Sequence, residues 1–264
     1  MYQISKEGKN LHGNINISGS KSESNRLLTL RAYTSFFNIN NLSDSDDTKT
    51  MISSLKSHKE EINIGHAGTA MRFLTSYYSS ILNSSKILTG SSRMKERPIL
   101  ILVEALNNLG ADIEYIDKKG YPPIKINGKL IDGNEIALPA DVSSQYISSL
   151  MMLGVSINQG LKIKLSTKIT SLPYIYMTKK IIERIGGIVD IKPDEIIIKQ
   201  LVSNKIPDQI VESDWSSASY FYSLVALSDS SDITLSSFFN NSIQGDSRIV
   251  DIYKQFGVET KFLN

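Results

Sequence analysis

The pattern of apolar and polar positions alternates between helical and strand-like stretches. After Gly68, apolar residues follow the spacing of one helix face: Ala70, Met71, Leu74, Tyr77, Tyr78 and Ile81. From Arg97 the same spacing recurs, with Pro98 suited to the first turn: Ile99, Leu102, Val103, Leu106 and Leu109. The segments Ile124–Asn127 and Leu161–Leu165 alternate instead as half-buried strands do. This mixture predicts an α/β fold.

The same order of elements recurs at a nearly constant interval. In each predicted unit a strand leads through a small-residue loop into a helix, and a second strand, loop and helix follow. The first helices are predicted to start 75 and 73 residues apart, near Gly68, Ser143 and Ser216. Glycines suited to the C-caps of the second helices follow at intervals of 76 and 71 residues: Gly110, Gly186 and Gly257. Two independent landmarks therefore indicate one structural repeat.

A shortened unit precedes these. Its first helix is predicted to start at Lys21, and Asp46, Asp47 and Thr48 open its second helix. An aspartate at a helix start is stabilised by the helix dipole. This role explains the acidic cluster of Asp44, Asp46 and Asp47 better than a cation site does.

Composition narrows the possible classes of function. The chain has 264 residues, of which 41% are hydrophobic and 21% charged, and its formal net charge of +2 indicates neither a nucleic-acid nor a membrane partner. The absence of cysteine excludes disulfides, thiolate metal sites and a cysteine nucleophile. His12 and His58 lack metal-ligand spacing. We expect no metal and no cofactor. The start lacks a signal-peptide pattern, so we expect a soluble cytoplasmic protein.

Several predicted helix starts are suited to binding anions. A helix N-terminus presents unpaired N–H groups and a partial positive charge. Lys21 and Arg26 lie near the start of the first predicted helix, and Arg93 precedes another. If the repeats pack symmetrically, these ends converge on a small ligand with two anionic groups. The alternative is that the serines and threonines of these loops only cap their helices.

Three longer motifs make the chain resemble a known enzyme family. They lie at residues 19–26 (GSKSESNR), 67–72 (AGTAMR) and 93–98 (RMKERP). Serine-rich segments follow in the family's order at residues 143–145, 171–174, 214–220 and 242–246. On these residues the chain resembles 5-enolpyruvylshikimate-3-phosphate synthase, over the N-terminal two-thirds of that family's length. The resemblance covers nearly the whole chain.

The resemblance implies an enolpyruvyl transferase-like α/β fold of βαβαββ pseudo-repeats, in which three units form one globe. Residues 20–211 are expected to form one complete globe, with a shortened first unit. Residues 1–19 and 212–264 are expected to form part of a second globe, in which the strand at residues 13–18 lies against residues after Glu212. The chain is therefore expected to stop short of the family's C-terminal third.

The implied reaction transfers the enolpyruvyl group of phosphoenolpyruvate (PEP) to the 5-hydroxyl of shikimate 3-phosphate and releases phosphate, by addition and elimination without a metal. The resemblance assigns shikimate 3-phosphate to Lys21, Ser22, Arg26, Ser143, Ser144, Gln145, Ser171 and Tyr174. It assigns PEP to Lys21, Gly68, Arg93 and Gln145. Lys21 is the catalytic candidate, since the acid–base carboxylates are expected beyond residue 264. The chain alone is therefore expected to bind without turnover.

The expected partners are these two small molecules, with no nucleic acid and no membrane, and a full-length member is expected to be a monomer. Gly68 implies sensitivity to glyphosate, the family's inhibitor, which occupies the PEP pocket. Three features depart from the family: His66 replaces asparagine, Phe73 replaces proline, and residues 56–60 replace a longer hairpin. Two alternatives stay open. One is the sister transferase acting on UDP-N-acetylglucosamine, whose first loop differs, and the other is a substrate-binding fragment without turnover.

Overall fold

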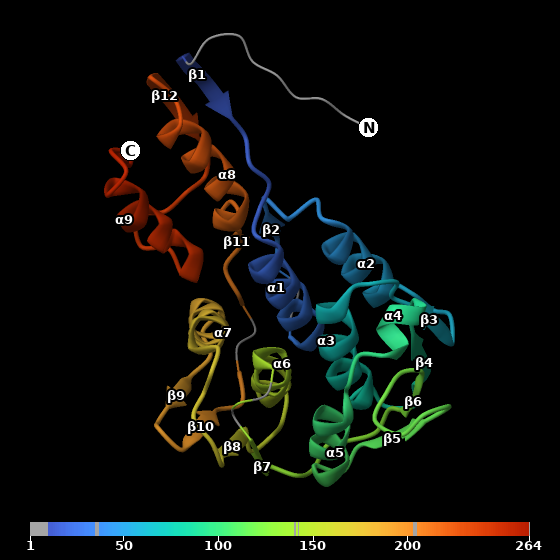
Figure 1. The fold of residues 1–264 in the computed structure, drawn as a ribbon. Coiled ribbons are helices and arrows are strands. Elements are labelled where there is room, and N and C mark those ends of the chain that lie inside the picture. The colour runs from blue at the N-terminus through green and yellow to red at the C-terminus, as the bar shows by residue number, and fades with distance from the viewer. Residues whose placement is uncertain (1–9, 35–36, 140, 142, 203–204, 264) are drawn as a thin grey trace.

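Helices and strands alternate along the chain, whose computed structural model describes residues 10–34, 37–139, 141, 143–202 and 205–263 (Figure 1). The helices are α1 Lys21–Tyr33, α2 Asp46–Leu55, α3 Gly68–Ser79, α4 Ser92–Lys95, α5 Leu100–Asn108, α6 Ser144–Gly154, α7 Leu172–Arg184, α8 Trp215–Ala226, the 3₁₀ helix η1 Gly245–Arg248 and α9 Ile249–Lys254. The strands are β1 Asn10–Ile15, β2 Ile39–Asn40, β3 Glu61–Asn63, β4 Ser85–Thr89, β5 Asp112–Tyr115, β6 Ile124–Asn127, β7 Glu135–Leu138, β8 Leu161–Leu165, β9 Val189–Ile191, β10 Glu195–Ile198, β11 Gln209–Ile210 and β12 Ser230–Leu235. Residues 1–9, which belong to the expected partial second globe, lie outside the described residues.

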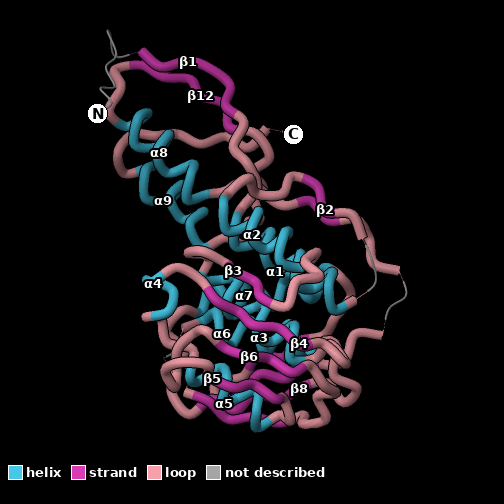
Figure 2. Tube along the Cα trace, turned by 90° about the vertical axis from the view of Figure 1, so that its right-hand side faces the viewer, coloured by secondary structure: helices cyan, strands magenta, loops and turns pink. Residues whose placement is uncertain are grey.

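Two sheets of four strands within the described residues share one topology. The strand orders are β3-β4-β6-β5 and β7-β8-β10-β9, and in each the first pair is parallel while the other two pairs are antiparallel. The strands of the first sheet lie side by side, with helices behind them (Figure 2). The repeat predicted from the sequence is therefore confirmed.

The predicted helix landmarks are also confirmed. The first helices begin at Gly68, Ser144 and Trp215, within one residue of the predicted positions. The glycines expected after the second helices all have positive φ values, between 81° and 102°: Gly110, Gly186 and Gly257. A residue with a side chain is strained in this conformation, so glycine ends each of these helices at low cost.

The core lies between the sheets and the helices. In β6, Ile124 and Ile126 are completely buried while Lys125 between them is half-buried, as strand alternation predicts. Burying one such side chain contributes about 1.5–3 kcal/mol. These residues join a hydrophobic cluster that extends along the chain from Leu27 to Val211. Five further buried residues form a separate, smaller cluster: Ile17, Trp215, Ala218, Tyr222 and Val258.

Two of the βαβ units obtain their first strand from a distant part of the chain. In the repeats with four-stranded sheets, the strand before the first helix pairs in parallel with the strand after it. By contrast β1, which precedes α1, pairs in parallel with β12, which follows α8. Reciprocally, β11 precedes α8 and pairs with β2, which follows α1. The two segments therefore cross, and they are bridged where Gly19 faces Ser213.

Some boundaries differ from the sequence-based expectations. The helix predicted from Arg97 begins at Leu100, because residues 92–95 form the separate turn α4 and Pro98 disfavours a helical residue before it. Helix α3 ends at Ser79, so Ile81 lies beyond it. The first strand occupies residues 10–15 instead of 13–18, because the chain leaves the sheet to enter the crossing. Among the described residues, no helix is long and apolar enough to span a membrane.

Candidate functional site

Three helices that carry predicted site residues begin without a side-chain cap. Ser20 before α1, Ala67 before α3 and Ser171 before α7 make no side-chain hydrogen bond to their helices. Their first N–H groups are therefore not taken by a cap and can receive an anion. Ser143 differs, because its hydroxyl accepts the N–H of Gln145 at 3.3 Å. The capping alternative thus holds for Ser143 but not for Ser20 or Ser171.

The starts of α3 and α6 are linked by a side-chain contact. Gln145 donates its Nε2 to the hydroxyl of Thr69 at 3.2 Å. Thr69 directly follows Gly68, so Gln145 lies beside the glycine loop. One turn further along α6, Ser148 receives a hydrogen bond from Arg26 of α1 at 3.2 Å. The three helices therefore place Gly68, Gln145 and Arg26 around one region.

Arg26 is a buried cation held by neutral groups. Its side chain is only 2% exposed, and it donates to the Thr178 hydroxyl at 2.7 Å and to the Ser22 carbonyl at 2.8 Å, in addition to Ser148. Among the described residues no carboxylate contacts it. Burial lowers the pKa of Arg26 to about 10, so it stays charged at neutral pH. A buried, uncompensated guanidinium is suited to a ligand that carries negative charge.

Two aromatic rings also face Arg26. The centroids of Phe73 and Tyr174 lie 5.5 and 5.8 Å from its guanidinium carbon. Such cation–π contacts stabilise a buried cation by about 0.5–2 kcal/mol each. Phe73 is completely buried, whereas Tyr174 is 43% exposed. Tyr174 therefore extends from Arg26 to the surface, where a ligand ring can contact it.

At Gly68 the missing side chain leaves room for two more guanidinium groups. A Cβ atom built on Gly68 would lie 2.2 Å from Nη1 of Arg97 and 3.0 Å from Nη1 of Arg72. Arg72 is 4% exposed and donates to the Gly68 carbonyl at 2.9 Å. Burial lowers the pKa of Arg72, and the nearby charge of Arg97 lowers it further. Two cations that approach each other in this way favour an anion beside them.

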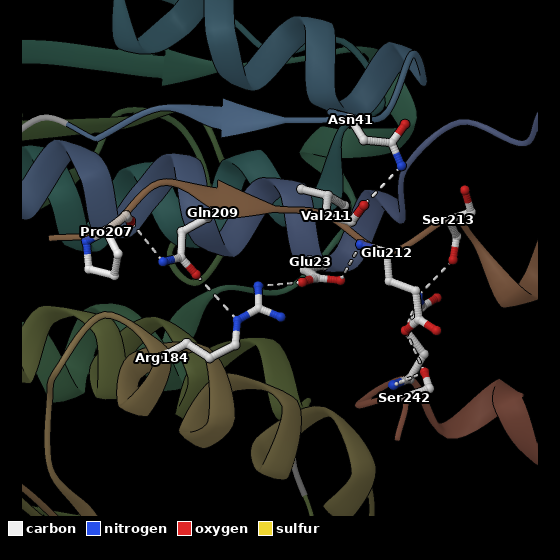
Figure 3. Close-up of polar contacts among 10 residues, drawn as sticks. Glu23, Asn41, Arg184, Pro207, Gln209, Val211, Glu212, Ser213 and Ser242 are labelled. Atoms are coloured by element: carbon white, nitrogen blue, oxygen red, sulfur yellow. Dashed lines mark hydrogen bonds and ion pairs between the residues drawn. The ribbon is translucent and has the colours of Figure 1, made fainter. Parts of the chain in front are cut away.

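The first turn of α1 is fixed to the crossing segment by Glu23 (Figure 3). The Glu23 carboxylate is fully buried, contacts Nη2 of Arg184 at 2.6 Å and accepts the N–H of Glu212 at 3.2 Å. The Glu212 carboxylate in turn accepts hydrogen bonds from Trp215 at 2.7 Å and Ser242 at 2.5 Å. This network connects the start of α1, which carries Lys21, to both sides of the crossing.

Comparison with known proteins identifies the family. The family model described as EPSP synthase (3-phosphoshikimate 1-carboxyvinyltransferase) matches residues 53–262. The chain belongs to the EPSP synthase family. A 3-phosphoshikimate 1-carboxyvinyltransferase of Bacteroides fragilis strain YCH46 is 44% identical over 249 residues, covering 94% of this chain and 60% of that protein. One of Vibrio atlanticus is 34% identical over 279 residues, covering 95% and 65%.

The fold of this EPSP synthase family member matches solved structures. An EPSP synthase from Acinetobacter baumannii superposes with a TM-score of 0.77 at 20% identity, covering 93% of this chain and 61% of that one. A second structure of that enzyme gives the same TM-score. The chain thus spans about 60% of the length of the relatives that it matches.

Within this EPSP synthase family member, the residues predicted for shikimate 3-phosphate lie at the starts of three helices. Lys21 is exposed and Ser22 is half-buried in α1, and Ser144 is buried in α6. Ser171 is half-buried and immediately precedes α7, which carries Tyr174. Their contacts with ligands remain predictions. The surroundings of Arg26 bring Ser22, Tyr174 and α6 together.

Of the residues predicted for PEP, Arg93 is not among the side chains nearest to Gly68. Arg93 lies exposed on α4, and the guanidinium at Gly68 belongs to Arg97 instead. Both arginines are in the motif at residues 93–98, and residue type and spacing alone do not distinguish between them. Arg72 lies in the motif at residues 67–72, but its place in that motif does not show that its side chain approaches Gly68. Thr178 and Ser148 lie inside helices, where a hydroxyl carries no recognisable signal.

The substituted residues of the glycine loop have defined places. His66 is exposed, and its Nδ1 lies 2.8 Å from the hydroxyl of Ser91, which caps α4. Phe73 packs beneath Arg26. His12 and His58 are exposed. Among the described residues there is no cluster of His, Asp or Glu that could hold a metal ion.

Proposed function

We propose that the chain serves the reaction of 3-phosphoshikimate 1-carboxyvinyltransferase, the transfer of the enolpyruvyl group of PEP to the 5-hydroxyl of shikimate 3-phosphate. We also propose that residues 20–211 act as one complete globe that carries the binding surface, and that residues 10–19 and 212–263 belong to a second globe. Family membership supports the reaction. The observation that carries the substrate assignment is Arg26, a buried cation that no described carboxylate compensates.

Shikimate 3-phosphate is proposed to bind at the starts of α1, α6 and α7. Lys21, Ser22 and Ser171 would receive its phosphate and carboxylate together with the uncapped N–H groups of α1 and α7. The buried Arg26 would supply positive charge, and the exposed part of Tyr174 would lie against the cyclohexene ring of the ligand. Ser143 and Ser144 would contribute hydroxyl groups. These roles are positioning and charge compensation.

PEP is proposed to bind at Gly68. The uncapped start of α3 and the Arg97 guanidinium would receive its anionic groups. Gln145, which contacts Thr69, would lie between the two substrates together with Lys21. We therefore propose Arg97, in place of Arg93, as the arginine of this subsite. Gly68 without a side chain leaves the pocket open to glyphosate as well.

The chemistry also needs proton transfers. PEP must gain a proton at its methylene carbon while the shikimate hydroxyl loses one, which requires positioned acid–base groups. The nearby buried carboxylate, Glu23, is bound to Arg184 and to the Glu212 N–H, and is thus engaged in structure. By resemblance to the family, we propose that the acid–base carboxylates belong to the part of the relatives that this chain does not span. Residues 1–264 alone are therefore expected to bind but not to turn over.

Titration calorimetry tests this assignment. The 264-residue chain is titrated with shikimate 3-phosphate and, separately, with UDP-N-acetylglucosamine. We expect heat of binding for shikimate 3-phosphate and none for UDP-N-acetylglucosamine. Once shikimate 3-phosphate is bound, we expect PEP to bind more tightly than to the free chain, although still weakly. Binding of the UDP-sugar would favour the sister transferase. Binding of neither would refute the proposed substrate assignment for this chain.

A further inference from the structure

The carbonyl of Pro98 accepts two hydrogen bonds from side chains on other helices. Tyr146 of α6 donates its hydroxyl at 2.5 Å, and Arg72 of α3 donates Nη2 at 3.3 Å. Pro98 directly follows Arg97 in the chain. These two hydrogen bonds therefore fix the backbone from which the Arg97 side chain reaches Gly68.

Arg97 depends on such support because its guanidinium lies beside another cation. Nη1 of Arg97 and Nη1 of Arg72 both approach Gly68. Two like charges repel each other unless an anion lies near them. Arg97 is exposed, and among the described residues no carboxylate contacts it. Before an anion binds, its position is therefore set largely by its backbone.

We propose that Tyr146 is a positioning residue that keeps the Arg97 guanidinium at Gly68 by holding the Pro98 carbonyl. This inference rests on the proposed function, in which Arg97 receives PEP. A neutral hydroxyl restrains the carbonyl without adding a third positive charge. Gln145 and Tyr146 are adjacent in α6, so one helical turn contacts Thr69 with the first side chain and Pro98 with the second.

The chain offers a matched control for removing this hydroxyl. Tyr146 and Tyr78 are both 5% exposed, and both donate their hydroxyl to a backbone carbonyl. Tyr78 donates to Ser54 at 2.6 Å, on α2. Tyr146→Phe and Tyr78→Phe therefore remove the same kind of bond at equal burial, one beside Arg97 and one remote from it.

The experiment compares the wild-type chain with the two variants. The dissociation constant of shikimate 3-phosphate is measured by calorimetry. That of PEP, at saturating shikimate 3-phosphate, is measured by saturation-transfer NMR, which detects millimolar affinities. Without any ligand, the rate at which phenylglyoxal modifies Arg97 is measured by mass spectrometry. Thermal melting of each variant reports the stability cost of the lost hydroxyl.

Tyr146→Phe is expected to weaken PEP binding by about two- to tenfold, the effect of one hydrogen bond. The dissociation constant of shikimate 3-phosphate should change by less than twofold, whereas the rate at which phenylglyoxal modifies Arg97 should change. Tyr78→Phe should lower only the melting temperature. An unchanged PEP affinity and Arg97 modification rate in Tyr146→Phe, or equal changes in both variants, would overturn the positioning role. If the wild-type chain binds neither ligand, the proposed function fails, and the Arg97 modification rate still decides whether Tyr146 holds Arg97.

Discussion

A methyl group added at Gly68 should displace Arg97 and weaken PEP binding without unfolding the protein. The Cβ atom of Gly68→Ala would lie 2.2 Å from Nη1 of Arg97, whereas ordinary contact begins at 3.4 Å, so this nitrogen must retreat by about 1.2 Å. The nearest atoms belong to the end of a flexible, exposed side chain, which can move at little cost. Nη1 of the buried Arg72, at 3.0 Å, needs to yield by only a few tenths of an ångström. We therefore expect the melting temperature to change by no more than about 3 °C, equivalent to less than 1 kcal/mol.

The effect on PEP should be much larger. A hydrogen bond to a charged group contributes about 1.5–3 kcal/mol, so losing that of Arg97 should weaken PEP binding roughly tenfold to 150-fold. Binding is measured by saturation-transfer NMR at saturating shikimate 3-phosphate. The binding of glyphosate, which by resemblance to the family occupies the same pocket, should weaken by a similar factor.

A double-mutant cycle identifies the cause. If the methyl group acts through Arg97, Gly68→Ala should have little further effect in an Arg97→Ala background, because the displaced group is already gone. Additive losses from the two substitutions would show that the methyl group blocks the ligand directly. An unchanged PEP affinity in Gly68→Ala would remove Gly68 and Arg97 from the subsite.

Two other predictions concern the surrounding residues, and a third concerns turnover by the whole chain. Arg26→Ala should weaken shikimate 3-phosphate binding roughly tenfold to a hundredfold by calorimetry, whereas Arg31→Ala on the same helix should not; equal losses would mean that Arg26 acts only through folding. Burial raises the pKa of Glu23 above its ordinary value of 4.5 more than the partly exposed Arg184 lowers it. Because the protonated form is favoured in the folded state, wild type should lose stability relative to Glu23→Gln as pH rises from 4.5 through the raised pKa. Thermal melts across pH check this, and a wild-type advantage that grows with pH would contradict it. Finally, the 264-residue chain should release no phosphate from the two substrates, and turnover near that of a relative would place the acid–base groups within these residues.

The sequence was sufficient for the repeat because each unit carries its own signals. The helix starts and the C-cap glycines are local features, and the strand alternation in Ile124–Asn127 is visible in four residues. The crossing could not be derived from these signals. Strands β2 and β11 have two residues each, too few to show a period, and only the resemblance indicated that the first strand leaves its own unit.

The candidate site could also be predicted only in part. Motifs identified Arg26, Gly68 and Gln145, and in the structure α6 contacts both Arg26, through Ser148, and Thr69, through Gln145. The choice between Arg93 and Arg97 depends on the bend at Pro98, which ends the continuity between α4 and α5. Such a bend decides which side chain faces Gly68, and neither residue type nor spacing encodes it.

The exchanged strands also determine the order in which the fold can be completed during synthesis. Asn10 pairs with Ser230 and Ile15 with Leu235, so each pair in β1 and β12 is separated by 220 residues. At a ribosomal rate of about 5–20 residues per second, β1 waits roughly 10–40 s for its partner. Its edge is unpaired throughout that interval, a condition that favours association between nascent chains. The first of the described strands to emerge is thus among the last of them to be paired, and β2 likewise stays without β11 until residue 210 has been added.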